Sequence, residues 1–376
     1  MFGALFEIDD EERSSLDAAE PGYAPLLVRV SDETDNETEA LTYEWPGSRV
    51  EARPYDWYVS TVLAGAHHHR LPKDYSDYQL GVESDPDPLA SGVRPATPED
   101  LPAMQRVLAA ALADDGDRYS AHTGELAWWM FHGDPRFPDH LSFWRQDDQG
   151  IVVIDSRNPE INAFTVPGHP LEPLIGWATR YLRGRGEVGW VSDYDAQLVG
   201  YLRSLGYRPK ATDRSFDWDL AEVEVPSPRL PDGWALRPVE GEFEANSRRE
   251  ASHAAFKSTM EPQIHLDRYL GFMRSPAYDA ERDLVAVSSD GQIAAFMVWW
   301  PDDSGVAQIE PFGTHPSFQR QGIGTALLHF GLGRMREAGM RSVRVITDDY
   351  REDATSFYTA AGFEDVGRVR WWGPSS

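Results

Sequence analysis

The sequence of 376 residues contains no cysteine. Disulfide bonds, thiolate nucleophiles and cysteine-ligated metals are therefore excluded. Lysine is almost as scarce, because only Lys73, Lys210 and Lys257 are present. Lys and Arg together number 35 against 62 Asp and Glu, which gives a formal net charge of −27. Nucleic acids and anionic membranes bind clustered basic residues, so we expect neither as a partner.

Long apolar runs are missing too, as is a basic segment followed by an apolar one at the start. We therefore expect no membrane-spanning helix and no secretory signal, and a soluble protein of the cytoplasm. Hydrophobic residues make up 41% of the chain, which is enough to fill several cores. The acid excess is typical of proteins from a salt-rich cytoplasm, so it predicts a halophilic source and indicates nothing about a reaction.

Two segments rich in proline and polar residues, at 81–92 and 223–233, are typical of linkers. They predict three parts, at residues 1–85, 92–222 and 233–376. This number agrees with a domain size of roughly 100–200 residues.

The second and third parts carry the same markers in the same order. These are Arg-Pro at 94–95 and 237–238, His-Pro at 169–170 and 315–316, and YLRSLGY at 201–207 and FYTAAGF at 357–363. The last pair ends two expected helices with a glycine at the left-handed cap position. Together the markers predict a duplication.

In the third part, apolar runs separated by turn residues predict strands at 283–289, 293–300 and 306–314. Apolar periodicity predicts a helix at 325–339, then a strand at 342–347 and a helix at 352–362. This order predicts a mixed sheet flanked by helices.

The clearest chemical signal is QRQGIGTALL, residues 319–328, between a predicted strand and a predicted helix. Gly322 and Gly324 allow the backbone to approach a ligand closely, and the helix start presents free N–H groups to an anion. A pyrophosphate fits this site, although an ordinary tight turn would explain the glycines equally. The spacing does not match the Rossmann fingerprint, which needs a third glycine.

The segment THPSFQRQGIGTALL, followed by Tyr358 and AAGF, resembles the GNAT acetyltransferase superfamily. Gln319, Gly322 and Gly324 match its loop pattern (Arg/Gln)-x-x-Gly-x-(Gly/Ala). The resemblance covers residues 234–372 with these motifs and residues 93–220 by general pattern. It implies an α/β (α+β) fold with two tandem GNAT-like mixed sheets flanked by helices.

The resemblance also implies acetyl-CoA as co-substrate and no metal. The diphosphate would lie on the loop after Gln319, which comprises Arg320, Gln321, Gly322, Ile323, Gly324 and Thr325. The pantetheine arm would pair with the strand at Phe312 and Thr314. An amine would attack the thioester directly, without a covalent enzyme intermediate.

Two residues are candidates for proton transfer. Tyr358 matches the family position that protonates the departing thiolate, and the alternative is a tyrosine that only packs on its helix. Glu310, on the strand before the loop, is the candidate base, and the alternative is an edge carboxylate of an acidic protein. We expect Trp299 and Trp300 to pack in the core rather than to form a ligand cage. His253 and His265 lie in the substrate-facing part, where a lone histidine usually only packs or faces solvent.

The first copy lacks the chemistry of the second. After its His-Pro pair no Gly-x-Gly follows, and Pro173 stands where backbone donors would be needed. Leu202 occupies the position of Tyr358. We therefore predict a degenerate copy that binds no CoA and shapes the substrate cleft of the second.

The first 80 residues resemble the C-terminal half of a γ-glutamylcyclotransferase. Glu20, in LDAAEPGY, matches the catalytic carboxylate of that family, and GAHHHRLP follows an expected helix. The N-terminal substrate loop of the family is missing, so we expect no independent cyclotransferase activity. His67, His68 and His69 point in different directions and indicate a solvated helix end, not a metal site. The acidic stretch 31–39 indicates a hairpin loop.

The leading hypothesis is an N-acetyltransferase that transfers the acetyl group of acetyl-CoA to a small-molecule amine. The alternatives are a CoA-binding sensor without turnover, and a cyclotransferase with accessory GNAT domains. The sequence leaves open the identity of the amine and whether the chain forms a homo-oligomer.

Overall fold

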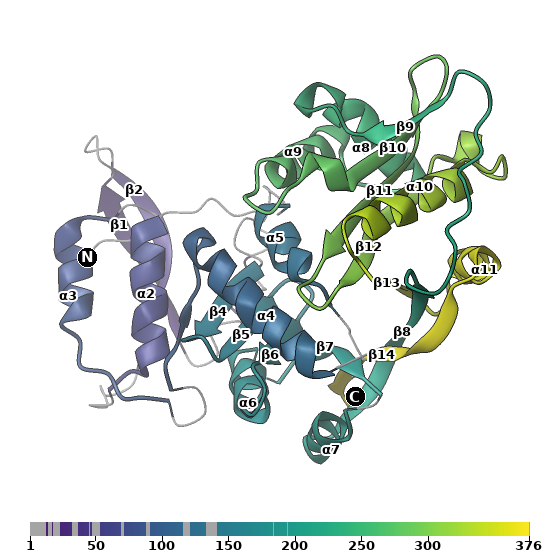
Figure 1. The fold of residues 1–376 in the computed structure, drawn as a ribbon. Coiled ribbons are helices and arrows are strands. Elements are labelled where there is room, and N and C mark those ends of the chain that lie inside the picture. Colours follow the sequence, from purple (N-terminus) through teal and green to yellow (C-terminus); the bar gives the residue numbers. More distant parts are fainter. Residues whose placement is uncertain are drawn as a thin grey trace. The chain divides into compact units, whose positions relative to one another are not determined.

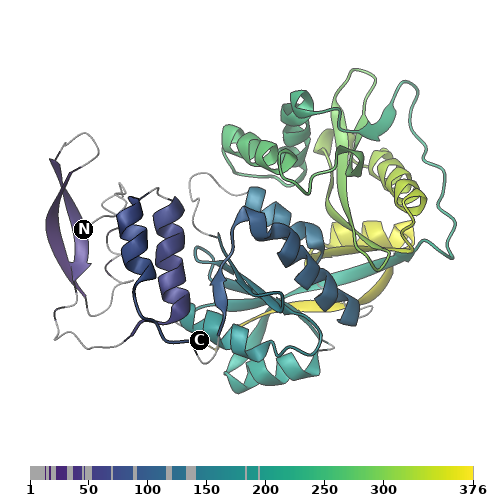
Figure 2. The ribbon, with the colours of Figure 1, turned by 60° about the vertical axis from the view of Figure 1, so that its left-hand side comes forward.

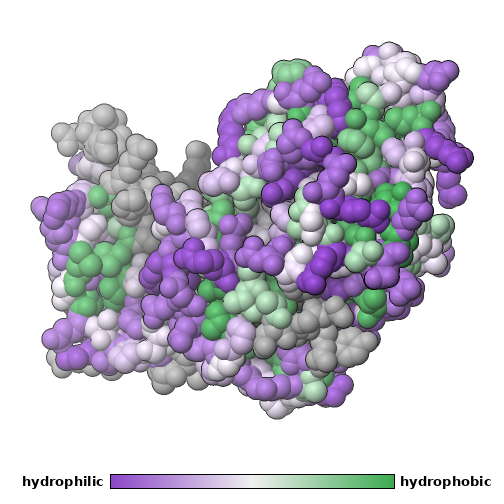
Figure 3. Space-filling view, viewed as in Figure 1, coloured by the Kyte–Doolittle hydropathy of each residue, from purple (hydrophilic) through white to green (hydrophobic). Residues whose placement is uncertain are grey.

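The computed structural model describes residues 13, 17, 23–31, 37–44, 46, 53–68, 71–87, 91–115, 121–132, 141–182, 184–193 and 195–375. The chain forms two compact units, Met1–Arg94 and Pro95–Ser376. No helix in the described part of the chain is long and apolar enough to cross a membrane. Hydrophilic residues cover much of the described surface on the face seen in Figure 3, as expected for so acidic a chain.

The described residues of the first unit form an antiparallel hairpin and the two helices α2 (Asp56–His68) and α3 (Lys73–Leu80) (Figure 1). Strands β1 (Ala24–Ser31) and β2 (Glu37–Glu44) pair along their whole length, so the predicted loop at 31–39 is too long: Ser31 and residues 37–39 belong to the strands, and residues 32–36 lie outside the described residues. Helices α2 and α3 follow. The backbone of His67 and His68 forms the end of α2, whereas His69 and Glu20 lie outside the described residues.

The second unit contains two halves with the same order of elements, as the repeated markers predict. The first half comprises β3 (Val93–Pro95) at the unit boundary, α4 (Leu101–Asp115), α5 (Thr123–Phe131), β4 (Leu141–Gln146), β5 (Gly150–Asp155), β6 (Glu160–Thr165), α6 (Glu172–Tyr181), β7 (Glu187–Ser192), α7 (Ala196–Ser204) and β8 (Tyr207–Asp219). The second half comprises β9 (Ala235–Pro238), α8 (Ala245–Ala255), α9 (Pro262–Met273), β10 (Asp283–Val287), β11 (Ile293–Pro301), β12 (Val306–Thr314), α10 (Ile323–Glu337), β13 (Ser342–Asp348), α11 (Glu352–Ala361) and β14 (Glu364–Pro374). Every strand and helix predicted for this second half is present, within a few residues at the ends.

One large sheet joins the two halves, because their last strands are exchanged (Figure 2). From β4 onward the strand order is β4-β5-β6-β7-β14-β8-β13-β12-β11-β10-β9. Strand β14 of the second half pairs with β7 of the first, and β8 of the first half pairs with β13 of the second. The two predicted mixed sheets are therefore continuous with each other.

Helices cover both faces of the second half of the sheet. Leu284, Ala295 and Met297 pack in the core cluster that contains α10, whereas Val285 and Phe296 pack with Ala251 of α8. Alternate residues of a strand point to opposite faces, so α10 lies on one face and α8 on the other. Figure 1 shows α10 along β11 and α9 beside α8.

Glycine caps end the equivalent helices α7 and α11. Gly206 has a φ of 81° and Gly362 a φ of 100°, both in the left-handed region that glycine adopts without strain. Leu202 of α7 is fully buried at the position that Tyr358 occupies in α11. The predicted correspondence of the two segments is therefore found in their helix ends.

Candidate functional site

The loop before α10 has the geometry of an anion site. Gly322 caps the helix with a φ of 79°, and Arg320 also has a positive φ of 60°. Gln319, Arg320 and Gln321 are exposed, and the side chains of the two glutamines bind back to the carbonyl oxygens of Thr314 and Ser317. The first N–H groups of a helix have no intrahelical partner, so those after Gly322 can donate to a ligand.

Gly324 is required by the close approach of the helix start to β12. A Cβ atom at this position would lie 2.7 Å from Oγ1 of Thr314. Ile323, between the two glycines, is buried and anchors the helix in the core. Of the predicted loop residues, Ile323 therefore holds the loop in place, and its side chain is not available to a ligand.

Strands β12 and β13 separate beside this loop. Their parallel pairs run from Val306 to Gln308 of β12 and end there. Phe312 and Thr314 pair with β11 on the other edge of β12. The edge of β12 that faces β13 is thus open at the positions predicted to pair with an extended ligand.

Tyr358 lies in α11 and is 8% exposed. Its ring packs among four aromatic rings, those of Phe216, Phe312, Phe357 and Phe363, with centroids 5.4 to 6.5 Å apart. Burial raises the pKa of Tyr358, and the nearby charge of Glu310 raises it further. The phenol therefore keeps its proton at neutral pH, as a general acid must.

Glu310 lies on β12 two residues beyond the last pair with β13. Glu310 as a whole residue is exposed, and its side chain lines a cavity of about 150 Å³. Protein atoms surround the carboxylate otherwise, so burial raises its pKa well above the usual range, and the charges of Glu125 and Asp213 add to the rise. A carboxyl group with a raised pKa is suited to take up a proton near neutral pH.

The other walls of this cavity come from both halves of the unit. They are His122, Glu125, Trp128, Trp129, Trp190 and Trp300. One ligand atom each of His122, Glu125 and Glu310 lies within 4.8 Å of the others, close enough to share one bound cation. Neither ring nitrogen of His122 makes a well-aligned hydrogen bond within the described residues, although Nε2 lies 3.3 Å from Glu125 Oε1.

The two halves meet at the ring of Trp300. His122 stacks on this ring with a centroid distance of 5.3 Å, and the indole nitrogen donates to the carbonyl oxygen of Glu310. A Cβ atom at Gly124 would lie 2.0 Å from the ring, so only glycine allows α5 to lie there. Trp299 packs in the core as predicted. Trp300 is equally buried, but it also lines the cavity.

Backbone strain is found at the same cavity. Trp190 has a φ of 60°, which places a bulky residue in the left-handed region inside β7. This conformation costs about 1–2 kcal/mol and persists only where the surroundings impose it. Its ring lies 5.6 Å from that of Trp371 of β14, so the exchanged strand helps to hold Trp190 at the cavity.

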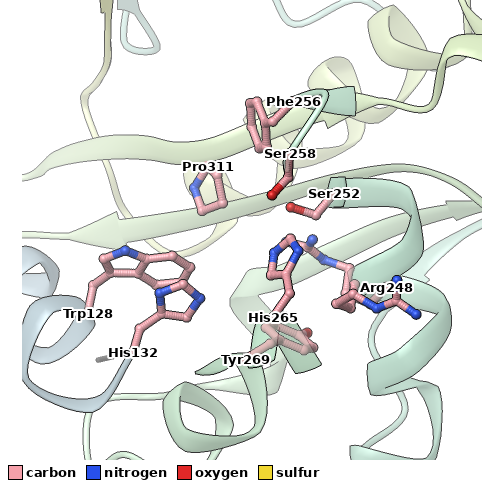
Figure 4. Close-up of a pocket in the computed structure, with 10 residues that line it drawn as sticks. Trp128, His132, Arg248, Ser252, Phe256, Ser258, His265, Tyr269 and Pro311 are labelled. Atoms are coloured by element: carbon pink, nitrogen blue, oxygen red, sulfur yellow. The ribbon is translucent and has the colours of Figure 1, made fainter. Parts of the chain in front are cut away.

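A second cavity, of about 190 Å³, shares Trp128 with the first (Figure 4). It is lined by Trp128, His132, Arg248, Arg249, Ser252, Phe256, Ser258, His265, Tyr269 and Pro311. His253 and His265, which the sequence presents as lone histidines, approach each other with their Nδ1 atoms 3.3 Å apart.

The sequence did not indicate the first-half residues of either cavity. His122, Glu125 and Trp128 belong to a segment without a recognisable motif, and they reach Glu310 only because the two halves pack together. Arg248 and Arg249 carry no local signal either. A search for acidic and aromatic residues in the first copy would have found Glu125 and Trp128. It would not have shown that they lie beside Glu310.

Two family models match this chain, and one of them covers the loop before α10, Glu310 and Tyr358. Residues 249–363 match the model of the acetyltransferase (GNAT) family, and residues 1–78 match that of the AIG2-like family. The second match falls on the segment that resembles γ-glutamylcyclotransferases.

Two relatives match well over half of the chain. A mycothiol acetyltransferase of Nocardiopsis dassonvillei is 31% identical over 272 residues, which cover 62% of this chain and 81% of the relative. One from Pseudarthrobacter chlorophenolicus is 25% identical over 336 residues, or 85% of this chain and 95% of the relative. A solved tandem GNAT protein from the clavulanic acid biosynthesis pathway shares the fold, with a TM-score of 0.55, 16% identity and coverage of 76% of this chain and 99% of its own.

Proposed function

This chain belongs to the acetyltransferase (GNAT) family, and we propose that its second half transfers the acetyl group of acetyl-CoA to the amine of a small molecule. The observation that carries the proposal is the arrangement around the open edge of β12. The loop before α10 lies at one end of this edge. Glu310 and Tyr358 lie close to each other beside the edge. The GNAT family uses acetyl-CoA as co-substrate.

Each part of acetyl-CoA has a matching element in the second half. The diphosphate would accept hydrogen bonds from the N–H groups at the start of α10, with the helix dipole favouring its charge. The pantetheine amides would pair with the free edge of β12 near Phe312 and Thr314. The thioester would then lie between Tyr358 and Glu310, at the point where β12 and β13 separate.

The acidic cavity would hold the acceptor amine. An amine arrives as an ammonium ion, and the carboxylates of Glu125 and Glu310 would neutralise its charge. The indole rings of the walls favour a cation over their faces as well. Two carboxyl groups that share one cavity repel each other without a cation, and this repulsion adds to the desolvation that raises the pKa of Glu310.

The reaction follows from these positions. Glu310 takes a proton from the ammonium, and the free amine nitrogen attacks the thioester carbonyl carbon. A C–N bond forms, the C–S bond breaks, and Tyr358 donates its proton to the departing thiolate. The nitrogen loses its second proton to solvent as the amide forms, and Tyr358 regains a proton from solvent. The products are an amide and free CoA, and no covalent enzyme intermediate is needed.

The name of the relatives directs the choice of acceptor to be assayed first, which is the amine of mycothiol precursors. An assay of free CoA release with these compounds and with simple amines tests the proposal. CoA binding without release with any amine would instead support a sensor.

Replacement of Tyr358 by Phe should lower kcat about 100-fold and leave the Kd of acetyl-CoA unchanged, because only the proton donor is removed. The measurement is CoA release together with calorimetric titration of acetyl-CoA. Tyr350→Phe is the matched control, because Tyr350 is 79% exposed on the neighbouring loop. Unchanged turnover of Tyr358→Phe would exclude the role as acid.

The first half should bind no CoA, so calorimetry should give one equivalent per chain. Helix α6 begins with Pro173 in its first turn, which removes one of the N–H donors that an anion needs. Leu202 replaces the proton donor. Two equivalents per chain would show that the first copy is not degenerate.

A further inference from the structure

The second cavity, between α5, α8 and α9, contrasts with the acidic one in its charge. Two arginines and two histidines line it, and none of its lining residues is acidic. The sequence holds 62 acidic against 35 basic residues, so this composition runs against that of the whole chain. The acidic cavity has the opposite pattern, with two glutamates and neither lysine nor arginine in its walls.

Not all of the positive charge is neutralised by neighbours. Arg248 binds Asp283, which also accepts a hydrogen bond from Tyr269 at 2.5 Å. Arg249 binds Glu250, whose side chain is 58% exposed and therefore screened by water. Arg268 of α9 donates to the carbonyl oxygen of His132, and its charge contributes to the lowered pKa of His132 and His265.

Two buried side-chain nitrogen atoms have no hydrogen-bond partner among the described residues. Nε of Arg249 and Nδ1 of His132 are fully enclosed, and the described residues offer neither of them a hydrogen-bond partner. Arg249 is 9% exposed and His132 8% exposed. Buried polar groups without a partner cost free energy, and Nε of Arg249 can only donate, so an unpaired donor in a residue that lines a cavity points to a ligand that accepts from it.

Hydroxyl groups complete the set of donors. In Figure 4 the side-chain oxygens of Ser252 and Ser258 face one another above the ring of His265. Trp128, Phe256 and Pro311 form the remaining, apolar walls. The cavity thus offers donors on one side and apolar surface on the other.

The lowered pKa values of His265 and His132 indicate the same positive charge around the cavity. Burial lowers the pKa of His265 to about 4, and His253, Arg249, Arg268 and Arg248 lower it further. Burial also lowers the pKa of His132, with contributions from Arg268, His265 and Arg248. An anion in the cavity would offset this field, whereas a metal cation would be repelled by it.

We propose that this cavity binds an oxyanion, a carboxylate or phosphate group, carried by the acceptor whose amine occupies the acidic cavity. The two cavities share Trp128, and Pro311 of one follows Glu310 of the other. The acceptor is therefore a small amine with an anionic group a few bonds away. This inference rests on the proposed function for the identity of the ligand, but not for the presence of the anion site.

The test measures anion binding without acetyl-CoA. The full chain, labelled with ¹⁵N, is titrated with inorganic phosphate and separately with acetate, at constant ionic strength in chloride. Long-range ¹H–¹⁵N spectra follow the ring nitrogens, which are assigned with His132→Gln and His265→Gln. We expect saturable shifts of both histidines and an increase of their pKa. The anion with the lower Kd identifies the favoured oxyanion.

Arg249→Gln should weaken binding about tenfold, because it removes a charged donor. Arg274→Gln should leave the Kd unchanged, because Arg274 forms an exposed pair with Glu242 outside the cavity. Should Arg249→Gln fail to fold, Arg249→Lys serves instead, since it keeps the charge and removes the Nε donor.

Three results would overturn the inference: no saturable shift, equal affinity in Arg249→Gln, or equal competition by chloride. Transfer to neutral amines without phosphate or acetate binding would contradict this inference alone. Anion binding in a chain that releases no CoA with any amine would support the anion site and contradict the proposed function.

Discussion

Glu310→Gln should lower kcat/KM for acetyl transfer by about 10²–10⁴, the range typical of removing a general base. Glutamine keeps the size of the side chain but cannot accept the proton of the ammonium. It should leave the Kd of acetyl-CoA unchanged, because the loop at Gly322 and the edge of β12 are not altered. CoA release and calorimetric titration of acetyl-CoA measure the two effects separately.

The pH profile distinguishes a base from a residue that only supports the fold. Burial and the charge of Glu125 raise the pKa of Glu310, so its carboxyl group is neutral at pH values where an ordinary glutamate is charged. The charged form is the base, and kcat/KM should therefore rise with pH through this raised pKa. In Glu310→Gln, kcat/KM should no longer fall at low pH through the pKa of position 310.

Glu125→Gln is the matched control for position 310. Glu125 lies in the same cavity, but we assign it to holding the ammonium rather than to taking its proton. Its loss should raise KM more than it lowers kcat. It should also move the fall of kcat/KM at low pH to a lower pH, because one negative charge beside Glu310 is gone. Dialysis against EDTA should change neither variant nor the parent. Equal loss of kcat in both variants, or loss of activity in EDTA, would contradict the assignment.

Asp213→Asn should raise the free energy of unfolding at pH 8 by about 3 kcal/mol. Asp213 of β8 pairs in register with Asp348 of β13 and is only 9% exposed. Burial raises its pKa from 3.8 to about 6, with further contributions from Asp348, Asp349 and Glu160. Asparagine keeps the size of the side chain and removes the charge that is costly there.

The direction of the pH dependence follows from the raised pKa. The folded state binds the proton of Asp213 more tightly than the unfolded state, so the parent loses stability as the pH rises from about 4 to above 6. The gain in Asp213→Asn should therefore be absent at pH 3 to 4 and complete above pH 7.

Urea denaturation at low salt measures this effect, because guanidinium would screen the charges. Asp303→Asn, in an exposed turn between β11 and β12, should have no effect at any pH. A loss of stability in Asp213→Asn at pH 8 would show that the carboxylate is stabilised by its surroundings.

The cofactor side of the site could be predicted because its signals are local. Gly322 is required by its positive φ, and Gly324 by its close contact with Thr314. Both glycines lie at the start of the helix that follows them. Tyr358 stands four residues before Gly362, so a single helix end carries both markers. Neighbours in the sequence remain neighbours in such elements, and a short motif is enough.

The acceptor side could not be predicted in the same way. Glu125 and His122 approach Glu310 because Gly124 allows α5 to lie on Trp300, a contact between two halves that are far apart in the sequence. The pairing of His253 with His265 depends on how α8 packs on α9. No local pattern records these contacts. The exchange of β8 and β14 is equally invisible, since each strand alone would suit the sheet of its own half.

This exchange affects the order in which the protein can be completed during synthesis. Strand β14 is made after all the other strands, yet it fills the place beside β7 and contacts Trp190. Until β14 leaves the ribosome, β7 keeps an unpaired edge, and such edges invite wrong pairing with other chains. The nascent first half must therefore wait for the last strand, and the acceptor site becomes available only when the whole second unit has been made.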